Sequence, residues 1–172
     1  MLHLESVSVE FPTAAGAVCP VDGVSLTVGP GERHVIVGET GSGKSVLLMS
    51  ILGLSGGRVT GSIRWNGQEL LGLTPQAWNQ IRGREIAYIP QGNASGLNPL
   101  MRIGDQIAEP LRIHLGMGQK AAAERVVSAL GRLDFARPEI WVSRYPHQLS
   151  EMCIRDRCSL WRVWMRTRNR IL

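Results

Sequence analysis

The sequence predicts an α/β fold. Three features carry this prediction: an alternating, strand-like N-terminus, a glycine-rich loop between a short apolar run and an apolar helix, and two helical stretches in the second half. The 172 residues are 44% hydrophobic and 19% charged, which is typical of a soluble globular chain that forms one domain with a packed core.

The first thirty residues predict two strands. Residues 2–11 alternate between apolar and polar side chains, as a half-buried strand does. Asp22-Gly23 predicts a turn, and residues 24–28 (VSLTV) predict a second strand directly after it. Gly29-Pro30-Gly31 would then turn the chain away from this strand.

The next stretch predicts a buried strand and a buried helix. His34 to Val37 form a short apolar run that stops at Gly38, as a buried strand would. Residues 44–54 (KSVLLMSILGL) have helical character and are apolar almost all round, so we expect this helix to be buried.

The middle of the chain predicts a hairpin, a helix and a further strand. Residues 61–67 (GSIRWNG) form a strand pattern that runs into the turn dipeptide Asn66-Gly67. Thr74-Pro75 is typical of an N-cap followed by proline at the first helical position, and it opens a helix expected to reach Ile81. Residues 85–89 (EIAYI) predict another short strand.

The second half predicts two helices after a loop. Residues 92–100 (GNASGLNPL) have the composition of a loop. Residues 103–114 and 119–133 have helical patterns, and the second contains strong helix formers at residues 121–124. No internal repeat and no low-complexity tract is present in the sequence.

Charge and cysteine usage narrow the class of protein. The net charge is +5, but residues 151–172 contribute +4 of it, from six Arg against Glu151 and Asp156. The remaining +1 gives no reason to expect a nucleic-acid partner. Cys19, Cys153 and Cys158 lack the spacing of a disulfide framework or a zinc site. No signal peptide or membrane-spanning stretch is recognisable, which favours a cytosolic chain.

A phosphate-binding loop is the most specific motif. Residues 38–45 (GETGSGKS) fit the pattern G-x-x-x-x-G-K-[ST]. Glycines let successive backbone N–H groups point into one concave space, and the following helix adds the positive end of its dipole. Lys44 would reach the β- and γ-phosphates of ATP, and the Ser45 hydroxyl would ligate Mg²⁺. The residues expected to contact the nucleotide are Gly38, Glu39, Thr40, Gly41, Ser42, Gly43, Lys44, Ser45 and Val46.

Three blocks together resemble one family. They are residues 38–54, residues 86–91 (IAYIPQ) with residues 97–111 (LNPLMRIGDQIAEPL), and residues 145–150 (YPHQLS). In order and spacing, residues 1–150 resemble the N-terminal part of an ATP-binding cassette (ABC) ATPase of the oligopeptide/dipeptide importer type. The resemblance implies an α/β P-loop NTPase fold with an antiparallel β subdomain, an incomplete RecA-like core and part of the helical subdomain.

The resemblance also implies roles for particular residues. Gln91 would be the Q-loop glutamine, which ligates Mg²⁺ and couples the γ-phosphate to a transmembrane permease. Residues 92–114 would form much of the surface that docks on that permease. Phe11 would stack on adenine, for which any aromatic ring is suitable. Leu149 and Ser150 would begin the family's signature motif. His147 lies close to that motif, and we expect a structural role for it.

Part of the family pattern is missing from the sequence. Glu151 and Met152 stand where the signature would continue with two glycines, and no apolar run ending in Asp-Glu follows residue 91. Residues 151–157 (EMCIRDR) can be back-translated to a transposon end used in sequencing libraries. We therefore expect residues 1–150 to be a truncated nucleotide-binding domain and residues 151–172 to be non-native. Such a chain would lack the catalytic half, expose apolar surface along its P-loop strand and helix, and hydrolyse ATP negligibly.

The resulting functional hypothesis is an importer subunit. It would couple ATP binding and hydrolysis to uptake of peptides or similar small solutes, at the cytoplasmic face of the bacterial inner membrane. Its partners would be permease subunits, a second ATPase subunit and, indirectly, a solute-binding protein. Two alternatives remain open: a soluble ABC ATPase acting in translation or DNA repair, and a non-catalytic nucleotide-binding module whose arginine-rich tail contacts RNA or lipid.

Overall fold

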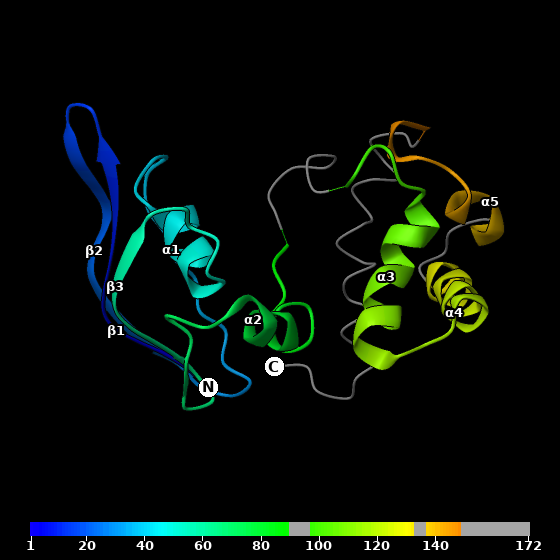
Figure 1. Cartoon of the computed structure of the whole chain (residues 1–172), viewed down its shortest axis with the longest axis horizontal. Helices are drawn as coiled ribbons and strands as arrows, with labels where there is room; N and C mark the ends of the chain where they lie inside the picture. The colour runs from blue at the N-terminus through cyan, green and yellow to red at the C-terminus, as the bar shows by residue number, and fades with distance from the viewer. Residues whose placement is uncertain (90–96, 133–136, 149–172) are drawn as a thin grey trace. The chain divides into compact units, whose positions relative to one another are not determined.

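The structure is a computed structural model that describes residues 1–89, 97–132 and 137–148 (Figure 1). It divides into two compact units, one from Met1 to Arg82 and one beginning at Gly83. The first unit holds an antiparallel sheet and two helices, and the second holds helices.

A four-stranded antiparallel sheet forms the frame of the first unit. Its strand order is β2-β1-β3-β4. The long strands β1 and β2 are joined by a tight turn at residues 14–15, and β1 also pairs with β3. The elements of this unit are β1 (Leu2–Thr13), β2 (Gly16–Val28), α1 (Lys44–Ile51), β3 (Arg58–Trp65), β4 (Gln68–Glu69) and α2 (Pro75–Ile81).

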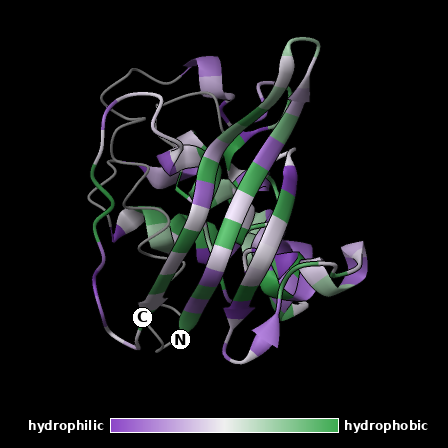
Figure 2. Cartoon of the chain, turned by 90° about the vertical axis from the view of Figure 1, so that its left-hand side faces the viewer, coloured by the Kyte–Doolittle hydropathy of each residue, from purple (hydrophilic) through white to green (hydrophobic). Residues whose placement is uncertain are grey.

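A bulge at Ser6 sets which face of β1 is buried. Strict alternation would place Leu4 and Val7 on opposite faces of the sheet, yet both are fully buried, as is Val9. Ser6 adopts a positive φ of 47°, and the register with both neighbouring strands shifts at this point. Gly61 lies across from the bulge, because a Cβ there would overlap the Ser6 carbonyl oxygen. Figure 2 shows the strands face-on, with hydrophilic and hydrophobic residues alternating along them.

The buried face of the sheet and the two helices share the core of the first unit. α1 contacts both β1 and β2, so the helix that follows the glycine-rich loop lies on the sheet. The buried apolar residues of this unit are Leu4, Val7, Val9, Val21, Leu47, Ile51, Leu52, Ile63, Leu70, Trp78 and Ile81.

The second unit is a small helical cluster. Its elements are α3 (Ile103–Leu115), α4 (Gln119–Gly131), α5 (Pro138–Val142) and the 3₁₀ helix η1 (Pro146–Gln148). Gly104 on α3 lies against Val142, because a Cβ at Gly104 would come within 2.7 Å of the Val142 side chain. Its hydrophobic core is formed by the buried residues Ala108, Leu111, Ala122, Val126 and Leu130.

Several predicted elements are confirmed. The Asn66-Gly67 turn has φ angles of 50° and 84°, and it joins β3 to β4 as a hairpin. The Thr74 hydroxyl accepts a hydrogen bond from the Ala77 N–H at 3.3 Å and caps α2, which ends at Ile81. α3 and α4 confirm the two predicted helices within the described residues.

The predicted turn at Asp22-Gly23 is wrong, and the strand predicted over residues 24–28 is the last part of a longer strand. β2 is one strand of 13 residues that begins at Gly16. Gly23 has a φ of 59°, and the register between β1 and β2 shifts on both sides of Val7 and Val9. The glycine therefore accommodates a bulge within the strand, and the chain does not reverse there.

The predicted buried strand at residues 34–37 is also wrong. This segment is not assigned to a strand, and Val35 and Val37 are 83% and 87% exposed. A strand needs a neighbour for its backbone hydrogen bonds, and none of the described strands pairs with this segment. The expected exposure of apolar surface is confirmed here and at Leu48 on α1, which is 42% exposed.

Two further boundaries differ from expectation. Residues 85–89 form no strand; the chain turns tightly after Gly83, whose N–H donates to the Ile86 carbonyl at 2.8 Å. The helix expected over residues 44–54 ends at Ile51, because Gly53 takes a left-handed φ of 64°.

Glu69 stabilises the β3–β4 hairpin with its carboxylate. It accepts a hydrogen bond from the Ser62 hydroxyl and bonds from the N–H groups of Ile63, Leu70 and Leu71 at 3.0–3.1 Å. Burial alone would raise the pKa of Glu69, but these donors outweigh it and lower the pKa. The ionised carboxylate of Glu69 is therefore the form that stabilises the hairpin.

We expect Glu69→Gln to destabilise the chain in a pH-dependent way. Since the folded-state pKa is lowered, this stabilisation is present above the unfolded pKa of about 4.3 and is lost as the pH falls through the folded value. Denaturant midpoints should therefore differ between wild type and variant at pH 7 and converge as the pH falls through the folded-state pKa of Glu69. Glu5→Gln, at an exposed position of β1, is the control, and a pH-independent difference for Glu69→Gln would contradict this role.

Candidate nucleotide-binding site

The glycine-rich loop leads directly into α1. Gly43 is the N-cap of the helix with a φ of 82°, and its carbonyl accepts the first helical hydrogen bond, from the Leu47 N–H at 2.9 Å. Gly41 has a φ of 88°, and the Ser42 N–H donates to the Glu39 carbonyl at 3.2 Å. The glycines thus allow the left-handed turns that bring the loop round to the helix N-terminus.

Gly43 also fixes the loop against the sheet. A Cβ at this position would overlap the Pro20 carbonyl oxygen of β2 and come within 3.3 Å of the Val21 side chain. A residue other than glycine would therefore have to move the loop, the strand or both. The sequence predicted Gly43 as a phosphate ligand and gave no sign of this contact.

Lys44 folds back over the loop. Its ammonium donates to the Gly38 carbonyl at 2.8 Å, to the Glu39 carbonyl, and to the Ser42 hydroxyl at 3.1 Å. Its positive charge therefore lies above a curved backbone, next to the N-terminus of α1, where the N–H groups of the first turn have no partner within the helix. This combination suits a multiply charged anion such as a polyphosphate.

The first turn of α1 supplies the remaining predicted contacts. Ser45 is exposed and offers its hydroxyl at the helix N-terminus, and Val46 is half-buried. A serine hydroxyl next to a phosphate suits Mg²⁺, which keeps several waters and uses substrate oxygens as ligands. Within the described residues, no cluster of three or more His, Cys, Asp or Glu could hold a metal ion without such oxygens.

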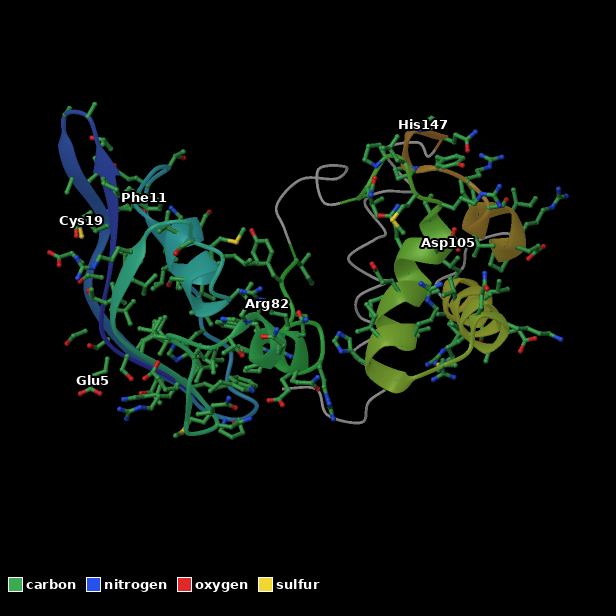
Figure 3. The ribbon with its side chains drawn as sticks, viewed as in Figure 1. Glu5, Phe11, Cys19, Arg82, Asp105 and His147 are labelled. Carbon is green, nitrogen blue, oxygen red and sulfur yellow. The ribbon has the colours of Figure 1, made fainter. Side chains whose placement is uncertain are left out.

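Phe11 lies near the end of β1, opposite Val18 of β2 (Figure 3). It is half-buried, and its ring covers Gly57, where a Cβ would come within 3.0 Å of Phe11 Cζ. Its stacking on adenine stays a prediction. Gln91, Leu149 and Ser150 lie outside the described residues, so their predicted roles also stay predictions.

Sequence reasoning missed Arg82, which binds the far end of α1. Its guanidinium donates from Nε to the Leu52 carbonyl at 2.8 Å and from Nη2 to the Gly53 carbonyl at 3.0 Å. Partial burial lowers the pKa of Arg82, but arginine keeps its charge in proteins. An arginine after an amphipathic helix is unremarkable in sequence, and its partners are backbone atoms.

Comparison with known proteins decides the family. The sequence profile of the ABC transporter family matches residues 21–172. The chain belongs to the ABC transporter family. The P-loop, the antiparallel sheet and the helical cluster are thus parts of an ABC ATPase fold, as the sequence motifs predicted.

Relatives of this ABC chain have names that refer to peptide transport. It is 39% identical over 153 residues to an oligopeptide transport ATP-binding protein of Mycobacterium tuberculosis, covering 87% of this chain and 25% of that protein. It is 38% identical over 154 residues to an oligopeptide transport ATP-binding protein of Bacillus subtilis, covering 87% of this chain and 47% of the relative. The chain therefore spans less than half the length of these curated relatives.

A solved structure supports the fold. A dimeric ATP-binding cassette in a post-hydrolysis state, bound to ADP and phosphate, superposes with a TM-score of 0.79 at 22% identity. The match covers 95% of this ABC chain and 68% of that chain. Among the described residues, no helix has the length and apolarity that crossing a bilayer requires.

We expect Gly43→Ala to be more harmful than its left-handed φ alone explains. The added Cβ meets the Pro20 carbonyl, so the free energy of unfolding should fall by about 1–3 kcal/mol more than in Gly31→Ala. Gly31 is a matched control, because its φ is 74° and its Cβ would meet nothing within 4 Å. Chemical denaturation followed by circular dichroism measures both, and equal losses would contradict the close contact with β2.

Proposed function

We propose that this chain is the nucleotide-binding part of an ATP-binding subunit of a peptide importer. The observation that carries this proposal is the geometry of residues 38–46, where Lys44 lies over a glycine-rich loop at the N-terminus of a helix seated on the sheet. The names of the relatives favour an importer over a soluble ABC ATPase of translation or DNA repair.

In this proposal each site residue has a definite task toward ATP. Lys44 exchanges its carbonyl partners at Gly38 and Glu39 for β- and γ-phosphate oxygens, while loop and first-turn N–H groups donate to the same anion. The Ser45 hydroxyl would hold Mg²⁺, which would supply charge neutralisation of the phosphates. Gln91 would be a second protein ligand of this metal, and Phe11 would stack on the base.

The proposed partners follow from the second unit and the signature remnant. Residues 92–114 dock on permease subunits at the cytoplasmic face of the inner membrane. By the family resemblance, Leu149 and Ser150 would contribute to the nucleotide site of a second ATPase subunit. A solute-binding protein delivers peptide, or a similar small solute, to the permease.

The start of α3 supports the docking proposal. Gln106 binds the loop before the helix through three hydrogen bonds of 2.9 Å, with the Asn98 N–H, the Asn98 carbonyl and the Met101 carbonyl. The Asn98 side chain in turn accepts from the Leu100 N–H at 3.0 Å. Leu100 is 85% exposed on this fixed loop, which suits an apolar anchor for a partner.

We further propose that the 172-residue chain binds ATP without turning it over. Hydrolysis requires a group that positions the attacking water. In the family resemblance this group is a glutamate after an apolar strand, and the sequence after residue 91 contains no apolar run that ends in Asp-Glu.

We expect Lys44→Ala to weaken ATP binding by about 10- to 100-fold, because it removes charge-assisted hydrogen bonds worth about 1.5–3 kcal/mol. Titration of a fluorescent ATP analogue in Mg²⁺ buffer measures this, with Lys120→Ala on the exposed face of α4 as the control. Binding that is unaffected by Lys44→Ala would overturn the proposed site. Lys44-dependent steady-state phosphate release by the wild-type chain would overturn the proposal that it lacks turnover.

We expect Leu100→Glu to reduce co-purification with co-expressed, detergent-solubilised peptide permease subunits by about tenfold, as for an anchor residue at the centre of an interface. Ile140→Glu, at a position on α5 that is 38% exposed and outside residues 92–114, is the control. ATP-analogue binding should be unchanged in both variants. Equal recovery of permease by the two variants would contradict docking at residues 92–114.

A further inference from the structure

We propose that Arg82 is a positioning residue for phosphate binding: it holds the C-terminal end of α1 and thereby fixes the helix whose first turn carries Lys44 and Ser45. This inference rests on the proposed nucleotide-binding function and deepens it. Arg82 does not belong to the phosphate loop in sequence, and it acts from the opposite end of the helix.

The end of α1 leaves two carbonyls for a side-chain donor. Gly53 takes the left-handed conformation, so its N–H donates to Ser50 at 2.9 Å and the Leu54 N–H donates to Met49 at 2.8 Å. This is the pattern of a Schellman motif. The carbonyls of Leu52 and Gly53 lie just beyond this motif, and the Arg82 guanidinium donates to both of them.

Packing holds the guanidinium in place. Trp78 of α2 is 7% exposed, and Arg82 Cζ lies 4.3 Å from the centroid of its ring. The same ring lies against Gly53, where a Cβ would come within 2.6 Å of Trp78 Cζ2. Arg82, Trp78 and Gly53 therefore join the end of α1 to α2 (Figure 3 labels Arg82).

Contacts at both ends of α1 fix the position of this helix within the first unit. At the N-terminus Gly43 lies against Pro20, and at the C-terminus Arg82 binds Leu52 and Gly53. A helix of eight residues is about 12 Å long and transmits a shift of one end to the other. The guanidinium charge also lies at the negative end of the helix dipole, whose positive end faces the proposed phosphate site.

If Arg82 only stabilised the fold, its loss would weaken the binding of all ligands equally and destabilise the whole first unit. A positioning role predicts a narrower effect, because α1 contributes to the phosphate site and Phe11 lies on β1. Loss of Arg82 should therefore weaken ligands that carry a polyphosphate and spare adenosine. Lysine keeps the charge but loses the planar fork, so it should restore only part of the affinity.

The test compares Arg82→Met, Arg82→Lys and the control Arg125→Met, at an exposed position of α4, in the 172-residue chain. A fluorescent ATP analogue is titrated directly, and tripolyphosphate and adenosine are used as competitors. For Arg82→Met we expect about three- to tenfold weaker binding of the analogue and of tripolyphosphate, unchanged adenosine binding, and an intermediate value for Arg82→Lys. The proposal would be overturned if Arg82→Met bound tripolyphosphate as tightly as the wild type, or if its affinity for adenosine fell by the same factor.

A nucleotide-free measurement separates this proposal from the proposed function. Hydrogen–deuterium exchange of residues 44–54 should become faster in Arg82→Met, while exchange of residues 2–13 stays unchanged. Unchanged exchange over 44–54 would overturn the role of Arg82 even if the wild-type chain binds ATP. A wild-type chain that binds neither ATP nor tripolyphosphate would overturn the proposed function and the phosphate-positioning role with it.

Discussion

The candidate site depends on the close contact between Gly43 and the Pro20 carbonyl of β2. The contact joins two stretches of backbone, so it admits no side chain and little adjustment. It fixes where α1 begins relative to the sheet, and Lys44 and Ser45 are the next two residues of the chain. The position of β2 comes from its long pairing with β1, from Leu2↔Val28 to Thr13↔Gly16. The position of the phosphate loop therefore depends on the register of the β1–β2 hairpin.

The hairpin itself depends on irregularity within its strands. Because Ser6 bulges, Leu4, Val7 and Val9 all enter the core, and the sheet presents one continuous apolar face. Leu47 and Ile51 of α1 are buried in the same unit, so the helix that carries the site residues is held by ordinary hydrophobic packing along its length. Contacts at the two ends of the helix, between Gly43 and Pro20 and from Arg82 to the Leu52 and Gly53 carbonyls, add to this packing.

The sequence predicted local features well and non-local ones poorly. The phosphate loop, the Thr74 cap and the Asn66-Gly67 turn follow from the conformational preferences of a few adjacent residues. The strands expected at 34–37 and 85–89 did not form, because strand formation depends on a pairing partner that an apolar run does not specify. Arg82 escaped prediction because its partners are carbonyls about thirty residues earlier in the chain, and backbone atoms leave no residue-type signature.

The proposed binding of phosphate would displace contacts that Lys44 makes in the structure. The Lys44 ammonium already has three acceptors, the Gly38 and Glu39 carbonyls and the Ser42 hydroxyl. In the proposed site an incoming polyphosphate would replace these neutral acceptors with charged ones, and only the difference between the two sets of hydrogen bonds would contribute to affinity. Since the loop is exposed, this difference is screened by salt. The affinity for phosphate would then depend on how well α1 holds Lys44 and the loop N–H groups in their relative positions. If the N-terminus of α1 were displaced, several weak hydrogen bonds to the phosphate would be lost together.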